Sequence, residues 1–321
     1  MRYKTLIVGL GQIGMGYDLH LDPAAFVYSH ARAFSLHSSF VLAGGVDTDP
    51  AHRATFEQTY QCPAYSDLDM ALSQQQPDIV VIAVPTPLHC ATVQRVLAQS
   101  KPRAILCEKP LSYDLDEART MVQDCAARGV ALYANYIRRS VSGAIEVKRR
   151  LDAGEISTPV KGVVWYSKGF LHNGSHFFNL LEYWLGAVTN AQIIATGRLW
   201  DDHDPEPDVR VVFERGAMVF LAAREEDFSH YTIELLATNG RLRYEKGGHQ
   251  IIWQAACPDP NFKGYTVLSD DSESIESGLS RYQWHVAEQL AAALEGRNFY
   301  LCSGAESLLT LENMQHILEM K

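Results

Sequence analysis

The chain lacks the features that mark several classes of protein. Its 321 residues include six cysteines, but these form no Cys-x-x-Cys pair and no cluster, which argues against a zinc site or a disulfide framework and favours a reducing compartment. No apolar run approaches the length needed to cross a bilayer. The first residues lead directly into an apolar, strand-like segment, so no signal peptide is expected. We therefore expect a cytoplasmic protein with no membrane partner.

Positive charge is also scarce. Lysine and arginine number 28 against 38 aspartates and glutamates, and the formal net charge is −10. A protein that binds nucleic acid presents a basic surface to the phosphates, so we expect no partner of that class. Hydrophobic residues make up 47% and charged residues 21%, as in ordinary globular proteins, and the length suits two domains.

The first part of the chain alternates between strand-like and helix-like segments. Residues 115–128 have apolar side chains at helical spacing. Such alternation predicts an α/β fold with a doubly wound parallel sheet, and we assign residues 1–130 to a Rossmann-type dinucleotide-binding domain. The apolar runs of strand length are 3–8, 41–46, 79–84 and two more that begin at 103 and 130.

The second part, residues 131–321, has a different pattern. Two pairs of β runs flank Gly216 and the Asn239-Gly240 dipeptide, which predicts antiparallel hairpins and hence an α+β domain. Two acidic stretches, 201–208 and 269–278, are expected to be solvated loops and not binding surfaces.

A glycine-rich stretch, TLIVGLGQIGMGYD, follows the first strand-like run. In a dinucleotide-binding loop Gly9 would allow the tight turn, Gly11 would let the backbone approach a pyrophosphate, and Gly14 would permit close helix–strand packing. The pyrophosphate would lie at a helix N-terminus, where unpaired N–H groups favour negative charge. Gln12 and Ile13 belong to the same loop. The alternative is a glycine turn with a purely structural role.

An acidic residue for the ribose hydroxyls is expected about 20 residues after such a loop. Asp47 ends the second strand-like run, but it lies 33 residues after Gly14. An insertion of about 13 residues would explain the difference, and residues 16–28 are the candidate, either as a lid over the cofactor or as a plain surface insertion. The Asp47 carboxylate would accept hydrogen bonds from a free 2′-hydroxyl and repel a 2′-phosphate, which favours NAD over NADP.

Three further stretches carry a resemblance to a known family. With ILCEKPLSYDLDEA, AVPTPLH before it and NYIRR after it, the chain resembles the Gfo/Idh/MocA family of oxidoreductases over nearly its whole length. The resemblance implies a second domain built on a large, mostly antiparallel open sheet. In the family this sheet often pairs with another copy, so a homodimer or homotetramer is implied.

The resemblance also implies roles for the residues of two loops. In AVPTPLH, Val84 and Thr86 depart from the usual Thr and Asn of the family's T-P-N-x-x-H loop. A cationic Lys109 would hold the substrate oxygen, stabilise a developing alkoxide and depress the pKa of a nearby imidazole. Pro110 restricts Lys109 to an extended backbone. The residues of these loops that join the expected cofactor site are Pro85, Thr86, His89, Glu108 and Lys109.

The segment FLHNGSHFFNLLEYWLG resembles the family's D-x-G-x-H-x-x-D segment, with Gly174 and His176 matching. His176 is the expected general base or acid. His172 and Asn179 stand where the family often has Asp, so either the proton path runs through His172 or the reaction works mainly in the reductive direction. Two histidines four apart could share a helix face as metal ligands, but no third ligand is apparent and Gly174 argues against a continuous helix, so no metal is expected. The apolar run after His176 predicts a buried helix.

The resemblance supports three interpretations of function. The first is an NAD-dependent dehydrogenase or reductase that acts on a sugar, nucleotide sugar or cyclitol, in the synthesis of surface carbohydrates. The second is a glycosidase that retains NAD, and the third is a cofactor-binding regulator, against which Lys109 and His176 argue. For Arg138 and Arg139 an ordinary salt bridge is the alternative to ligand binding. The candidate substrate contacts are Tyr136, Arg138, Tyr166, Lys168, Asn173 and Asn179.

Overall fold

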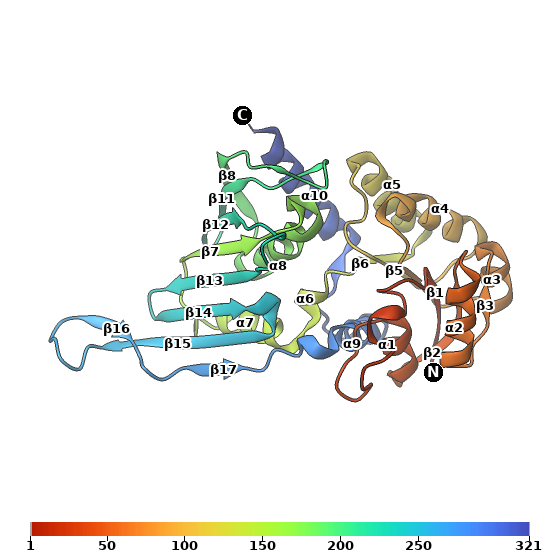
Figure 1. Cartoon of the computed structure of the whole chain (residues 1–321), viewed down its shortest axis with the longest axis horizontal. Coiled ribbons are helices and arrows are strands. Elements are labelled where there is room, and N and C mark those ends of the chain that lie inside the picture. The colour runs from red at the N-terminus through yellow and green to blue at the C-terminus, as the bar shows by residue number, and fades with distance from the viewer. Residues whose placement is uncertain (1, 321) are drawn as a thin grey trace. The chain divides into compact units, whose positions relative to one another are not determined.

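The chain folds into two units, each formed by two separate segments (Figure 1). Unit 1 comprises Met1–Ser140 and Ser280–Leu309, and unit 2 comprises Val141–Leu279 and Thr310–Lys321; the computed structural model describes residues 2–320. The boundary differs from the predicted one at residue 130, because the strand that begins at 131 extends the first sheet and residues 280–309 return to pack against it.

Unit 1 contains a seven-stranded sheet in the order β18-β6-β5-β4-β1-β2-β3. Neighbouring strands are parallel except β18 and β6. The chain order reverses next to β1, and ligands of doubly wound sheets bind beyond the carboxyl ends of the strands at such a point. The strands are β1 (Tyr3–Val8), β2 (Phe40–Val46), β3 (Ala64–Tyr65), β4 (Ile79–Ile82), β5 (Ala104–Cys107), β6 (Ala131–Ala134) and β18 (Cys302–Ser303).

Helices pack against this sheet through one apolar core. Ile7, Phe34, Leu106 and Leu290 are fully buried in it, so the first helix, the sheet and the returning segment share one hydrophobic core. α5 has the bounds predicted for it. The helices are α1 (His30–Leu36), α2 (Pro50–Tyr60), α3 (Leu68–Gln75), α4 (His89–Gln99), α5 (Leu115–Arg128), α6 (Ile137–Ser140) and α9 (Tyr282–Leu294).

A looped-out segment interrupts the helix that follows the glycine loop. The Met15 N–H donates to the Gly11 carbonyl at 2.9 Å, which closes one helical turn. The helix then resumes at α1, because the His30 N–H donates to the Ile13 carbonyl at 3.0 Å. Residues 15–29 are therefore an insertion into one helix, and they account for the unusual spacing between Gly14 and Asp47.

The insertion is folded around a buried carboxylate. Asp18 is fully buried and accepts hydrogen bonds from the Tyr28 N–H at 2.6 Å, the Ser29 N–H at 2.8 Å and the Ser29 hydroxyl at 2.7 Å. The Tyr28 ring stacks on Tyr282 of α9, with centroids 5.1 Å apart. Charge-assisted hydrogen bonds to main-chain N–H groups are strong, so this segment has a defined conformation.

Unit 2 contains a nine-stranded sheet in the order β16-β15-β14-β13-β7-β12-β11-β8, with β17 also paired to β15. Among the described strands of this sheet only β7 and β12 pair in parallel. The sheets of the two units confirm the predicted fold class. The strands are β7 (Val160–Tyr166), β8 (Val188–Ala195), β11 (Asp208–Phe213), β12 (Gly216–Ala222), β13 (Thr232–Ala237), β14 (Gly240–Glu245), β15 (Gln250–Pro258), β16 (Thr266–Leu268) and β17 (Glu273–Ile275).

Both predicted hairpins are present, but each turn lies just before the expected glycine. Gly216 pairs with Phe213 and Gly240 pairs with Ala237, so each glycine is the first residue of the second strand and not part of the turn. Outside the large sheet, β9 (Leu199–Trp200) and β10 (Asp204–Pro205) form a short antiparallel pair.

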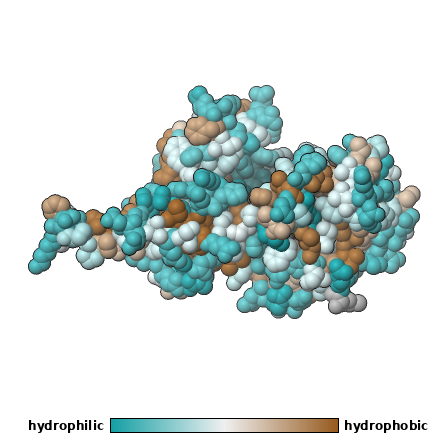
Figure 2. All heavy atoms as spheres, turned by 60° about the horizontal axis from the view of Figure 1, so that its bottom comes forward, coloured by the Kyte–Doolittle hydropathy of each residue, from teal (hydrophilic) through white to brown (hydrophobic). Residues whose placement is uncertain are grey.

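Helices cover one face of this sheet. Phe220 is fully buried there, and its ring lies 5.7 Å from that of Phe178 on α8. The other face carries the partly exposed Trp165 and Leu236. At one end of the sheet, the β15–β16 hairpin carries hydrophilic and hydrophobic side chains next to one another (Figure 2). The helices are α7 (Ser142–Asp152), the π-helical turn η3 (Gly169–Gly174), α8 (Ser175–Leu185) and α10 (Gly304–Glu319), whose residues from 310 belong to unit 2.

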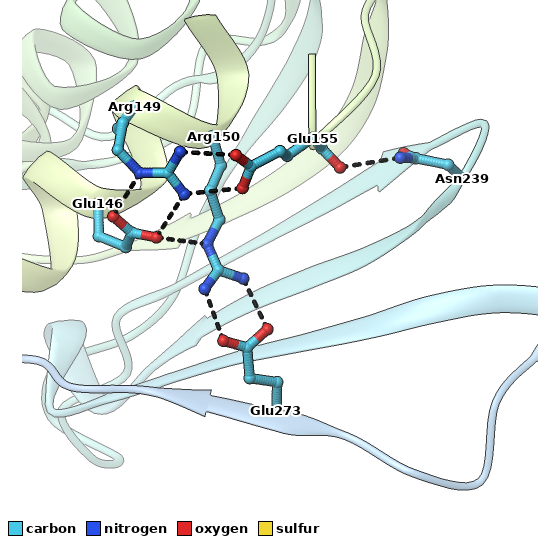
Figure 3. A network of polar contacts seen from close by, with 6 residues as sticks. All are labelled: Glu146, Arg149, Arg150, Glu155, Asn239 and Glu273. Atoms are coloured by element: carbon cyan, nitrogen blue, oxygen red, sulfur yellow. Dashed lines mark hydrogen bonds and ion pairs between the residues drawn. The ribbon is translucent and has the colours of Figure 1, made fainter. Parts of the chain in front are cut away.

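Charged side chains connect α7 to the edge of the sheet (Figure 3). The Arg150 guanidinium donates two hydrogen bonds to the Glu273 carboxylate, at 2.6 and 2.7 Å, and one to Glu146 at 2.7 Å. Arg149 bonds Glu146 and Glu155 on the solvent side. Residues 270–274 are exposed, as expected of a solvated segment, but the segment 269–278 is not all loop: Glu273 lies in β17, where backbone pairing with β15 and the ion pair with Arg150 order the chain.

We expect Arg150→Met to lower the free energy of unfolding by about 1 kcal/mol, because it removes charge-assisted bonds between a side chain that is only 14% exposed and the Glu273 side chain, which is 52% exposed. Arg149→Met is the matched control, and it should leave the urea midpoint almost unchanged, since its guanidinium is 50% exposed. Equal losses in the two variants would contradict this ranking.

Candidate functional site

The glycine loop at the carboxyl end of β1 has the form that a dinucleotide requires. A side chain at Gly9 would place its Cβ 2.6 Å from the Ala83 carbonyl oxygen, and one at Gly14 would place it 2.0 Å from the Gly9 carbonyl oxygen. Packing therefore excludes any larger residue at these two positions. At Gly11 a Cβ would meet nothing within 4 Å, so the space above this residue is open to an approaching phosphate.

Asp47 lies directly beside this loop. Its carboxylate accepts the Leu10 N–H at 2.7 Å and the Asp49 N–H at 2.8 Å, and the His52 ring nitrogen lies 3.3 Å away. The carboxylate is 14% exposed and lies at the end of β2, where an acidic residue of this fold meets the ribose hydroxyls. The loop and Asp47 together fit a dinucleotide with a free 2′-hydroxyl.

His89 connects the loops that follow β4 and β5. Its ring is 1% exposed and lies between the carbonyl oxygens of Val84, at 2.9 Å, and Pro110, at 3.0 Å. Burial lowers the pKa of His89. Main-chain oxygens lie beside both ring nitrogens, and the neutral ring donates to one of them, so His89 lies between these loops and its buried ring is not placed for the direct cofactor contact that its motif suggested. Pro85 and Thr86, in contrast, are exposed or partly exposed at the end of β4.

Glu108 and Lys109 follow β5 at the same edge of the sheet. The Glu108 carboxylate bonds the His30 imidazole and the Asn135 amide, each at 2.7 Å, and Lys109 is partly exposed. The Lys109–Pro110 peptide bond is cis. His30 shows no functional signal in the sequence, because the insertion separates it from the glycine loop.

In unit 2, η3 continues directly into α8. Gly174 has φ −56° and ψ −34°, so the expectation that it breaks the helix was wrong. His176 lies in the first turn of α8 and is 8% exposed, and the His172 ring stacks on Trp200 with centroids 5.0 Å apart. The predicted buried helix is confirmed, since Phe177 and most of the apolar side chains that follow it are fully buried.

Two carboxylates hold the turn that carries His172. Asp204 accepts the Leu171 N–H at 3.0 Å and the His172 N–H at 2.7 Å. Glu206 accepts the Gly169 N–H at 3.1 Å. Both side chains are 1% exposed, and burial raises the pKa of Asp204. The expectation that residues 201–208 form a solvated loop holds for residues 201–203, which are exposed, but was wrong for Asp204 and Glu206, which are buried and accept main-chain N–H groups.

Lys168 begins this turn in a left-handed conformation, with φ +62°, and Gly169 follows with φ +77°. A Cβ at Gly169 would lie 2.1 Å from the Asp204 carboxylate, so only glycine fits. The Lys168 ammonium lies 3.0 Å from the Glu225 carboxylate. A non-glycine residue in this conformation is strained, and such strain is common where a side chain must be aimed at a ligand.

Three predicted substrate contacts are instead buried. Tyr166 is fully buried and its hydroxyl donates to the Pro207 carbonyl at 2.6 Å. Asn179 is 1% exposed and donates to the Thr310 hydroxyl at 3.0 Å, and Tyr136 is 3% exposed. Their burial assigns Tyr166 and Asn179 to packing and leaves little of Tyr136 accessible to a ligand.

The remaining candidates keep exposed surface. Arg138, Lys168 and Asn173 are partly exposed, whereas the buried Arg139 donates to the Glu306 carboxylate at 2.7 Å. For Arg139 the salt-bridge alternative therefore applies. Within residues 2–320 we find no group of three His, Cys, Asp or Glu side chains arranged to hold a metal ion. The same range contains no helix with the length and apolar character needed to span a membrane.

The Glu225 carboxylate provides a test by pH. Burial alone raises its pKa, but hydrogen bonds from Ser229, Ser167, Lys168 and Tyr231 together lower it to about 2. A lowered pKa in the folded state adds stability that is complete above the ordinary value of 4.5 and is lost as the pH falls through about 2.

We therefore expect the difference in unfolding free energy between the parent protein and Glu225→Gln to be constant near neutral pH and to shrink below pH 4.5. Urea titrations from pH 7 down to pH 2.5 would measure it. Ser229→Ala removes one of the bonds and should show a weaker dependence on pH. A difference that does not change with pH would contradict this account.

The similarity to a known family lies in the first part of the chain. Residues 3–136 match the GFO_IDH_MocA family model, described as an oxidoreductase family with an NAD-binding Rossmann fold. An inositol 2-dehydrogenase from Mycolicibacterium smegmatis is 38% identical over 100 residues, or 31% of this chain and 28% of the relative. A scyllo-inositol 2-dehydrogenase (NAD(+)) from Bacillus subtilis is 30% identical over 203 residues, or 54% of this chain and 57% of the relative.

A third relative has a different kind of name. The 2,7-anhydro-N-acetylneuraminate hydratase of Escherichia coli is 23% identical over 211 residues, or 60% of this chain and 54% of the relative. The matches to these three relatives thus cover between 28 and 57% of their lengths.

Solved structures resemble the chain over nearly all of it. The WlbA dehydrogenase from Bordetella pertussis, in complex with NADH and UDP-GlcNAcA, has a TM-score of 0.76 at 18% identity and covers 98% of this chain and 94% of its own. An oxidoreductase from Agrobacterium radiobacter, in complex with NAD+, L-tartaric acid and magnesium, has a TM-score of 0.75 at 18% identity, with 98 and 95% covered. These likenesses show that the whole chain has the fold of such proteins.

Proposed function

We propose that the chain is an NAD-dependent oxidoreductase of the Gfo/Idh/MocA family, because residues 3–136 match the model of that family. It transfers a hydride between the nicotinamide and a secondary alcohol or ketone of a sugar, nucleotide sugar or cyclitol, in surface-carbohydrate synthesis. The observation that supports the proposal is the presence of two candidate loops at the carboxyl ends of strands in the parallel sheet. There a glycine loop bonded to Asp47 and the Lys109 loop follow strands of the same sheet.

The cofactor supplies hydride acceptance and donation, and the chain supplies charge and proton transfer. Lys109 holds the substrate oxygen and stabilises negative charge on it, an effect that is large where water is excluded. His176 accepts the hydroxyl proton in oxidation and returns it in reduction. His172 has its main chain fixed by Asp204, so its ring can take part in the same proton path without rearrangement of the turn.

The partly exposed Arg138, Lys168 and Asn173 supply the polar groups that a polyhydroxylated ligand needs. Arginine and lysine also bind phosphate through charge-assisted bonds, which suits a nucleotide sugar. The accessible face of the large sheet is the surface by which two copies associate, and the protein acts in the cytoplasm. These assignments rest on exposure, residue chemistry and the family resemblance.

A redox-neutral reaction is the second candidate, in which the hydride returns to the substrate in each cycle. The similarity to the 2,7-anhydro-N-acetylneuraminate hydratase of Escherichia coli favours it. A glycosidase that retains NAD would behave alike. Neither of these reactions produces net NADH, whereas a dehydrogenase does. The absorbance of the nicotinamide therefore distinguishes the two classes of reaction. A regulator without activity would not need Lys109 and His176.

The proposal is tested by turnover. Purified protein is mixed with NAD or NADH and with panels of nucleotide sugars, free sugars, cyclitols and their keto forms, while nicotinamide absorbance is followed. We expect turnover on one panel, and Lys109→Met and His176→Ala to lower kcat by at least about 100-fold while NADH binding changes little.

Lys101→Met and His230→Ala are matched controls, since Lys101 precedes β5 on the opposite edge of the sheet and His230 lies near the accessible face of the second sheet. Both should retain activity. NADH binding without turnover on any panel would overturn the dehydrogenase, and hydrolysis of glycosides or anhydro sugars without net NADH would support the second candidate.

Asp47→Ala should weaken NADH binding by about tenfold or more and narrow the preference for NADH over NADPH, because it removes a charged acceptor for the ribose hydroxyls. Fluorescence titrations with both cofactors give the ratio of affinities. The control Asp49→Ala removes only the N-cap of α2, so it should lower stability and leave the ratio unchanged. An unchanged ratio in Asp47→Ala would exclude this role for the carboxylate.

A further inference from the structure

A buried cluster of polar side chains lies directly before Lys109 in unit 1. His30 is the first residue of α1, Glu108 follows β5 and Asn135 follows β6. His30 and Asn135 are each 1% exposed. The His30 Nε2 and the Asn135 Nδ2 both lie 2.7 Å from the same Glu108 oxygen, Oε1. Three separate elements thus converge on one carboxylate.

The chemistry of the three groups fixes the direction of these bonds. An ionised carboxylate only accepts, so the His30 Nε2 and the Asn135 amide both donate to it. Burial alone raises the pKa of Glu108, but the bonds from His30 and Asn135 and the positive charge of Lys109 bring it below its usual value. The structure therefore keeps a negative charge next to Lys109.

The other titratable groups in electrostatic contact with Glu108 do not compete with Lys109 near neutral pH. Burial raises the pKa of the Cys107 thiol and of the Tyr282 hydroxyl, and burial lowers the pKa of His89, so all three are uncharged there. Lys109 is the next residue in the chain, and its positive charge interacts favourably with the Glu108 carboxylate.

We propose that His30, Glu108 and Asn135 form a positioning unit that keeps Lys109 protonated, with His30 and Asn135 holding the Glu108 carboxylate ionised and in place. The inference rests on the proposed function and gives it a further requirement. A lysine that loses water around it tends to lose its proton, and a neutral amine cannot stabilise an alkoxide. An adjacent carboxylate opposes that loss.

Main-chain hydrogen bonds hold the elements that carry the unit. The His30 main chain is fixed by its bond to the Ile13 carbonyl at 3.0 Å, and the preceding Ser29 is fixed by the buried Asp18. The Asn135 N–H donates to the Cys107 carbonyl at 2.7 Å, which aligns the ends of β5 and β6. The insertion therefore supports the element that supplies the histidine.

Titration of Lys109 itself tests the inference. The full-length protein is reductively methylated with ¹³C-formaldehyde, and the dimethyl-lysine resonance that disappears in Lys109→Arg is followed with pH, with and without NADH. We expect the Lys109 midpoint to fall by about one pH unit or more in Glu108→Gln and by less in His30→Ala. His30→Gln retains a donor and should restore most of the difference.

His37→Ala is the matched control. His37 follows α1, is 4% exposed and bonds Glu288 at 2.9 Å, so it is a buried histidine paired with a glutamate without Lys109 beside it; Glu288 is 38% exposed, against 15% for Glu108. It should lower stability and leave the Lys109 midpoint unchanged. A Lys109 midpoint that is the same in Glu108→Gln, which keeps the shape of the side chain, or that moves as much in His37→Ala, would overturn the inference.

The readout also separates this inference from the proposed function. The Lys109 midpoint needs no substrate, so failure of every carbohydrate panel would leave a shifted midpoint as evidence for the positioning unit. Turnover with an unshifted midpoint would reject the positioning unit alone. Where both hold, the alkaline limb of kcat against pH moves toward lower pH in Glu108→Gln, by the same amount as the Lys109 midpoint.

Discussion

In each unit, carboxylates that accept main-chain N–H groups hold the loops that carry candidate functional residues. Asp47 binds the glycine loop through Leu10, Asp18 binds the insertion through Ser29, and Asp204 binds the turn that carries His172. Each is largely or fully buried. An unpaired charge in such a place would be costly, and an N–H left without an acceptor would be costly as well, so carboxylate and loop stabilise each other.

The same constraint explains why the insertion does not disturb the dinucleotide-binding fold. Residues 15–29 leave a helix after one turn and return to it, because the N–H groups of His30 and Ala31 bond the carbonyls of Ile13 and Gly14. The glycine loop keeps the turn that it needs, and α1 keeps its place in the core. Through this arrangement a segment remote from β5 delivers an imidazole to Glu108.

Local sequence patterns predicted much of the fold and part of the candidate site. The spacing of apolar residues and the positions of turn residues predicted the strands of the first sheet, the helix over 115–128 and both hairpins, because these elements depend on neighbouring residues in the chain. They misplaced the turns by one residue, because Gly216 and Gly240 pair across the hairpins. The local patterns also did not predict that residues 280–309 belong to unit 1, because packing against a sheet that is distant in the sequence requires no particular local pattern.

The pattern of charged residues gave a wrong prediction where tertiary contacts bury acidic side chains. An acidic run such as 201–208 is normally solvated, but here Asp204 and Glu206 are buried against N–H groups more than thirty residues away in the chain. Tyr166 and Asn179 likewise became packing residues once their neighbours were assembled. The sequence by itself indicated the glycine loop and Asp47, because their residue types and spacing suffice for that prediction, and it indicated the Glu108-Lys109 pair through its resemblance to a family motif. Only the tertiary structure decided which carboxylates are buried and which donors hold them, because burial and hydrogen bonding depend on residues that the chain brings together from a distance.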